Sequence, residues 1–181
     1  MKNCGQTESQ SVLEHGFSVK SYLFELLDHL EHGTPLKREW KIPEWLYSNK
    51  DMFLQSLPSR STLKLATVMH DCGKPFCLTI DEEGRKHFPN HAQISYDVFK
   101  SLFEDSLAAE LILHDMDIHL LKADGVEEFA KNPNALTHLL IGLSELHSNA
   151  RMFGGIDSTS FKIKYKSLDS RGKQITKIKN N

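Results

Sequence analysis

Ionisable side chains recur in this chain at positions where the helical pattern calls for apolar ones. In residues 11–33 the apolar residues follow helical spacing, and His15 lies on the same stripe. The stripe comprises Val12, Val19, Tyr22, Leu23, Leu26 and Leu30. A folded chain tolerates such groups on an inward face when they neutralise one another, so the pattern predicts helices that bring these residues together.

The same pattern continues along most of the chain. Helices are expected over residues 61–71, 90–102, 106–122 and 135–147, with Gly33 ending the first helix and Asn90 capping the third. Residues 76–88 indicate a small β-hairpin. Residues 34–60, which carry three prolines and both tryptophans, form an insertion of no assigned role. The predicted fold is an all-α helical bundle with a small hairpin.

The C-terminal segment has a different pattern. Phe161, Ile163 and Tyr165 alternate with Lys162, Lys164 and Lys166, which predicts a short strand with one cationic face. Residues 151–181 carry eight Lys or Arg and two acids, a net +6 that leaves −8 in the rest of the chain. Such an asymmetry is consistent with a phosphate-rich partner, and also with a solvated face.

Length and cysteine content place further bounds. The 181 residues, 39% of them hydrophobic, suit a single domain over residues 1–181. Cys4, Cys72 and Cys77 are few and odd in number, and residues 1–10 are polar. We therefore expect a soluble cytoplasmic protein without membrane association.

The ionisable residues on the predicted inward faces have the composition of a metal site. They are His15, His70 with Asp71, His91, the cluster His114, Asp115, Asp117 and His119, and the pair Glu145 and His147. Imidazole and carboxylate ligands suit divalent transition metals, with positions left open for water and substrate. The pattern predicts one or two ions and leaves Mn, Ni, Co, Fe, Zn and Mg open. His29, His32, His87 and His138 are interpreted as ordinary histidines.

The stretch "LATVMHDCGKPFCLTIDEEGRKHFPNHAQ" resembles the HD superfamily of metal-dependent phosphohydrolases, named for an adjacent His and Asp. It looks most similar to the HD domain of bacterial tRNA nucleotidyltransferases and to HD phosphatase modules of RNA repair. The resemblance implies that His15, His70, Asp71 and His91 are metal ligands. It also implies ligands from the fourth and last motifs: Asp115 and His119, with His114 as the alternative, and Glu145 where the family has an aspartate.

The resemblance further implies phosphoester hydrolysis, with Asp71 and Lys74 as the catalytic residues. The expected substrates are 2',3'-cyclic or terminal 2' or 3' phosphates of RNA ends or nucleotides, and Lys74, Lys162 and Lys164 would contact phosphate. One alternative is a nucleotidase that acts on free mononucleotides. A second is a non-catalytic module that binds a nucleotide.

Overall fold

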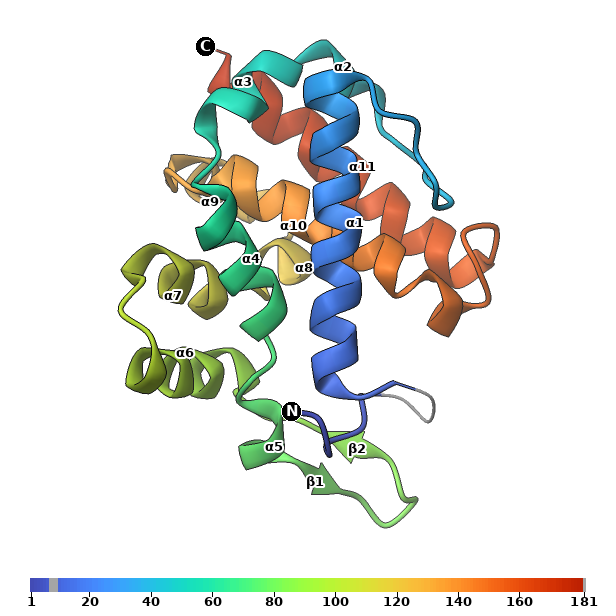
Figure 1. The fold of residues 1–181 in the computed structure, drawn as a ribbon. Helices are drawn as coiled ribbons and strands as arrows, with labels where there is room; N and C mark the ends of the chain where they lie inside the picture. The colour runs from blue at the N-terminus through green and yellow to red at the C-terminus, as the bar shows by residue number, and fades with distance from the viewer. Residues whose placement is uncertain (7–9, 181) are drawn as a thin grey trace. The chain divides into compact units, whose positions relative to one another are not determined.

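The computed structural model describes residues 1–6 and 10–180, and it is mostly helical with a small two-stranded antiparallel hairpin. The predicted all-α class with a small hairpin is confirmed. The chain divides into two compact units, and the division falls inside the long helix α1, Val12–His32 (Figure 1). The first unit holds Met1–Lys20 and Pro58–Met116; the second holds Ser21–Leu57 and Asp117–Asn181. One domain over 1–181 stays a prediction.

The first unit is built from short helices around the start of α1. After α4, Arg60–Met69, come α5, Lys74–Cys77, and the hairpin of β1, Thr79–Ile80, with β2, Lys86–His87. Helices α6, His91–Leu102, and α7, Ser106–Leu113, follow. Ser59 caps α4 by accepting from the Thr62 amide, and Asp105 caps α7 by accepting from the Ala108 amide. Thr62 also donates its hydroxyl to Asp105 at 2.8 Å, which joins the N-termini of α4 and α7.

Two glycines let backbones of the first unit approach closely. A methyl group at Gly16 of α1 would overlap the carbonyl oxygen of Val68 in α4, and one at Gly73 would overlap the backbone of Ser95 in α6. The Gly73 amide also donates to the Ser95 hydroxyl at 2.9 Å. These contacts bring the ends of α1, α4 and α6 together, and each of these ends carries a histidine.

The second unit packs around α10, Ala135–Ser148, which is buried along most of its length. The remainder of α1 joins α2, Glu44–Ser48; α3, Lys50–Ser56; α8, Asp117–Leu120; and α9, Val126–Lys131. Two short 3-10 turns, η1 (Ala123–Gly125) and η2 (Ala150–Phe153), precede α9 and α11, Thr159–Lys179. Within the 34–60 insertion, Trp45 packs on Gly172 of α11 and donates its indole N–H to Asp169 at 3.0 Å.

The predicted C-terminal strand is wrong, because residues 159–179 form the helix α11. The alternation over 161–166 is a short part of a longer helical pattern in which Phe161, Leu168 and Ile175 are buried. Ser158 caps this helix by accepting from the Phe161 amide. As a result Lys162 and Lys166 share one side of α11, and Lys164 lies on another.

The single helix expected over 106–122 is also wrong. Helix α7 ends at Leu113, and His114 adopts a non-helical conformation with φ −99° and ψ 14°. A turn over 114–116 separates α7 from α8. The helical spacing that would have placed Asp115 and His119 on one face therefore does not apply.

The predicted ends of the helices and of the hairpin agree only in part with the structure. Gly33 ends α1 with φ +69°, as expected, and its amide donates to the His29 carbonyl. Asn90 occupies the N-cap position of α6, as expected, but it adopts a left-handed conformation, φ 53°, and its side chain makes no capping hydrogen bond. Phe76 and Cys77 belong to α5 rather than to the hairpin.

Among residues 1–6 and 10–180, no helix combines the length and the hydropathy that crossing a membrane requires.

The contact of Gly16 with Val68 gives a stability prediction. We expect Gly16→Ala to lower the free energy of unfolding by about 2 to 3 kcal/mol, because the added methyl meets backbone rather than a flexible side chain. Urea denaturation followed by circular dichroism measures the change. Gly125→Ala is the matched control, since the nearest atom there is a Leu121 side-chain carbon at 3.3 Å. Equal stability of the two variants would contradict the prediction.

Candidate metal centre

Asp71 lies at the centre of a buried cluster in the first unit. Its carboxylate faces the Nε2 atoms of His70 at 3.3 Å, His91 at 3.7 Å and His15 at 3.9 Å. The Asp71 side chain is 2% exposed, and those of His15 and His70 are 0% and 4% exposed. The rings of His15 and His70 meet edge-on with centroids 5.2 Å apart. Residues 15, 70–71 and 91, from three separate parts of the sequence, thus form one cluster.

Backbone hydrogen bonds set the tautomers of two of the imidazoles. The Nδ1 of His70 lies 2.8 Å from the Thr67 carbonyl, and the Nδ1 of His91 lies 3.1 Å from the Phe88 carbonyl. A carbonyl oxygen accepts only, so each Nδ1 carries the proton and, in the neutral ring, Nε2 carries a lone pair. Each ring therefore presents to Asp71 the atom that ligates metals.

The charge state of His91 also favours metal ligation by its ring. Burial is the largest influence on its pKa and lowers it below the ordinary 6.5, although the nearby Asp71 carboxylate acts in the opposite direction. The ring is consequently neutral at neutral pH, which is the form that binds a metal.

Lys74 completes the cluster from the first residue of α5. Its ammonium donates to Asp71 Oδ2 at 2.6 Å and to the Gln6 side-chain oxygen at 3.0 Å, and it lies 5.2 Å from the centre of the Phe88 ring. The Lys74 side chain is 10% exposed, so the ammonium and the carboxylate are both largely removed from water. Such a pair persists because either charge alone would be costly to bury.

The turn after α4 holds Asp71 and Lys74 in place. The Cys72 amide donates to the Met69 carbonyl, and the Lys74 amide donates to the Asp71 carbonyl. Ser95 of α6 joins this turn, since it accepts from the Gly73 amide and its carbonyl accepts from the Cys72 thiol at 3.3 Å. Because Ser95 is one helical turn beyond His91, the same contacts fix the position of the His91 ring.

The donor set fits a divalent metal ion. Three imidazoles and one carboxylate from α1, the end of α4 and the start of α6 converge within the first unit. Neutral Nε2 atoms and carboxylate oxygens are all acceptors, and a cation between them would satisfy both kinds at once. This set matches open sites that bind Zn, Mn, Fe, Co or Ni, and its single carboxylate suits Mg less well.

The other predicted ligands are Asp115 in the first unit and His119 and Glu145 in the second. Asp115 is buried in the turn that follows α7, beside His114, which ends that helix. His119 and Glu145 belong to the second unit, where His119 Nε2 contacts the Glu145 carboxylate at 2.8 Å. The participation of Asp115, His119 and Glu145 in the Asp71 cluster stays a prediction.

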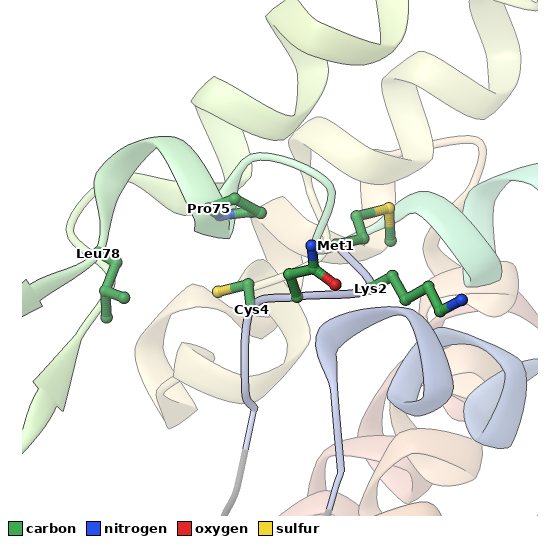
Figure 2. A pocket seen from close by; sticks show the side chains of 6 residues that line it. Met1, Lys2, Cys4, Pro75 and Leu78 are labelled. Carbon is green, nitrogen blue, oxygen red and sulfur yellow. The ribbon is translucent and has the colours of Figure 1, made fainter.

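A cavity of about 460 Å³ lies next to α5 in the first unit. Figure 2 shows the side chains of Met1, Lys2, Cys4, Pro75 and Leu78 at its wall, and Asn3 also lines it. Its volume is in the range of small-molecule pockets. Pro75 follows Lys74 in the sequence, but none of the residues that line the cavity in the described part of the chain belongs to the Asp71 cluster.

His147 of the second unit has a structural role. Its Nδ1 donates to the Leu143 carbonyl at 2.7 Å, and its Nε2 accepts from the Lys41 amide at 3.0 Å. Trp40 and Phe161 cover the ring, with centroids at 4.5 and 5.2 Å. Both nitrogens are used by backbone groups, so His147 is a core residue rather than a ligand.

His29 and His87, two of the four histidines interpreted as ordinary, make contacts outside the Asp71 cluster. His29 contacts the Thr34 carbonyl and the Tyr47 hydroxyl, and His87 pairs with Asp81 across the hairpin. Sequence reasoning missed Gln6, Ser95 and the cavity. A lone glutamine or serine carries no sequence signal of this kind, because its role depends on the folded turn.

No protein-family model, curated protein or solved structure matches this chain.

The buried imidazole of His147 gives a prediction on pH. Burial lowers its pKa to about 4, against the ordinary 6.5, so the unfolded chain binds a proton at this residue that the folded chain rejects. Protonation of His147 should therefore leave the free energy of unfolding unchanged above pH 6.5 and lower it by up to about 3 kcal/mol as the pH drops toward 4. We expect His147→Gln, whose amide can make both hydrogen bonds, to weaken this dependence.

Urea denaturation between pH 4 and 7 measures the effect. His32→Gln, at an exposed residue, is the control and should leave the pH dependence as it is in the wild type. The interpretation of His147 fails if its variant and the wild type lose stability in parallel.

Proposed function

We propose that this protein is a metal-dependent phosphohydrolase of the HD type. It would remove 2',3'-cyclic phosphates or terminal 2' or 3' phosphates from RNA ends or nucleotides. The observation that carries the proposal is the buried Asp71 carboxylate surrounded by the Nε2 atoms of His15, His70 and His91. The three free cysteines are consistent with the cytoplasmic location expected from the sequence.

A bound divalent ion would supply a water ligand of lowered pKa and polarise a phosphoryl oxygen. The chain's own residues prepare the site for that chemistry. Backbone carbonyls hold His70 and His91 in the tautomer that can ligate a metal through Nε2. The burial of Asp71 keeps solvent water away from its carboxylate. Asp71 provides the negative charge that a hard or borderline cation requires.

Lys74 is the residue proposed to bind the phosphate of the substrate. Its ammonium is already within the cluster, 2.6 Å from Asp71, and its position is fixed by a second hydrogen bond to Gln6. A preorganised cation next to a phosphoryl group stabilises the charge that develops during hydrolysis. The cavity of about 460 Å³ beside α5 belongs to the same unit as Lys74.

That cavity also supports the second candidate, a nucleotidase acting on free mononucleotides. A volume of about 460 Å³ accommodates a ligand of nucleotide size, and an exposed lysine, Lys2, lies at its wall. A panel of 2',3'-cyclic, 2', 3' and 5' mononucleotides, beside RNA with each kind of end, separates the two candidates.

The first prediction on function concerns Asp71. With a divalent metal present, Asp71→Asn should lower phosphatase or phosphodiesterase activity on this panel by at least about a thousandfold, because the central anionic ligand is lost. Release of inorganic phosphate and separation of nucleotide products measure the reaction. Asp97→Asn, on the exposed side of α6, is the matched control and should keep the wild-type rate.

Removing Asp71 also leaves the Lys74 ammonium buried without its carboxylate, which could unfold the protein. The double variant Asp71→Asn with Lys74→Met removes both charges and avoids this cost. Circular dichroism confirms that each variant is folded. Full activity in a folded Asp71 variant, or activity that survives exhaustive chelation, contradicts the proposal.

The second prediction concerns metal content. We expect elemental analysis of the metal-loaded wild type to find close to two ions per chain, and His91→Ala to lose about one of them, because its Nε2 faces Asp71 from a different helix than His70. His87→Ala, on the exposed hairpin, is the control. A wild-type content that never exceeds one ion at saturating metal favours a mononuclear centre instead.

A further inference from the structure

Four exposed lysines form a stripe along α11. Counted at about 100° per residue, Lys162, Lys166, Lys173 and Lys177 fall within about 60° of one another on the helix. At a rise of about 1.5 Å per residue, this lysine stripe is about 22 Å long. These four lysines share one side because residues 159–179 form a helix. In a strand, Lys162, Lys164 and Lys166 would have shared a face instead.

The packing of α11 holds the lysine stripe toward solvent. Phe161, Leu168 and Ile175 are buried on the opposite part of the helix, and Gly172 is in contact with the Trp45 ring. Rotation of α11 would expose these groups, so the orientation of the lysines is set by the core of the second unit.

Few acids offset the lysine stripe. Asp157 lies 3.4 Å from Lys162, and Asp169 lies 2.8 Å from Lys173. Both pairs are at the surface, where such pairs contribute little and are screened by salt. They are also the two acidic residues of 151–181, a segment of net charge +6. With these two acids counted against its four lysines, the stripe carries a net charge of +2, which favours polyanions.

A further cation extends this surface. The ammonium of Lys41 lies 5.1 Å from the centre of the Tyr165 ring, and Tyr165 is on the turn of α11 that carries Lys162 and Lys166. The Lys41 backbone is fixed by its hydrogen bond to the buried His147. Lys41 is exposed, and it lies beside one end of the stripe with its backbone held in place.

We propose that the lysine stripe, with Lys41, binds the phosphodiester backbone of single-stranded RNA. The charge of the stripe indicates a polyanion. That the polyanion is RNA rests on the proposed function. Lysine side chains reach phosphates rather than base edges, so binding is independent of sequence. A lipid surface fits less well, because the apolar face of α11 is buried in the second unit and is not available for insertion.

The test compares two pairs of substitutions on one helix. Lys166→Gln with Lys177→Gln removes two charges from the stripe. Lys164→Gln with Lys179→Gln removes two charges at least about 100° away from it, where Lys164 lies over the Phe153 ring and Lys179 donates to the Asn132 carbonyl. The two variants have the same net charge, so net charge does not account for a difference between them.

Fluorescence anisotropy measures binding of a labelled RNA of about 20 nucleotides to the full-length chain over a range of salt concentrations. The RNA ends in a 3' hydroxyl and the buffer contains a chelator, so the measurement does not depend on hydrolysis. We expect wild type and the Lys164 and Lys179 variant to bind alike. The stripe variant should bind about tenfold more weakly at low salt, with a slope of log K against log salt reduced by about 1.4.

Equal effects of the two variants, or no binding by the wild type at low salt, would overturn the proposal. So would equal or tighter binding to vesicles of phosphatidylcholine and phosphatidylserine in equal parts, since the partner would then be a membrane surface. A wild type that binds this RNA but hydrolyses none of the phosphoesters in the substrate panel would contradict the proposed function and leave the stripe as an RNA surface.

Discussion

The burial of one carboxylate governs the chemistry of the first unit. Asp71 is 2% exposed, and a carboxylate removed from water to this extent needs cations or hydrogen-bond donors around it. Lys74 provides one cation at 2.6 Å, while imidazole nitrogens surround the remaining oxygen surface. The helices that deliver these groups must approach closely, which is why Gly16 and Gly73 occur where backbones meet. The charge balance around Asp71 thus depends on the close backbone packing at Gly16 and Gly73.

The proximity of His15, His70, Asp71 and His91 could be expected from the sequence because these residues follow local rules. His15 and His91 fall on helical stripes, and His70 with Asp71 ends a third helix, so periodicity alone indicates that they point inward. Their convergence then follows from the cost of burying each one separately. Gln6 was beyond prediction, because its contact with Lys74 depends on how residues 1–6 fold back rather than on a pattern in the sequence.

The errors have physical causes too. Alternation over six residues favoured a strand at 161–166, although the helical spacing of Phe161, Leu168 and Ile175 over a longer window indicates a helix, as does the N-cap Ser158. The break after Leu113 gave no comparable signal. No glycine or proline occurs between Ser106 and Lys122, so the turn at 114–116 arises from tertiary packing, which overrides local propensity.

The contact between Gly73 and Ser95 bears on how sequences of this kind can diverge. Any side chain at position 73 would collide with the backbone of α6. In sequences that diverge from this one, the glycine after His-Asp-Cys should therefore persist even where the histidines are replaced. A sequence pattern built on this glycine would select chains that keep the close contact with α6, and the histidines would select those that also keep the cluster around Asp71.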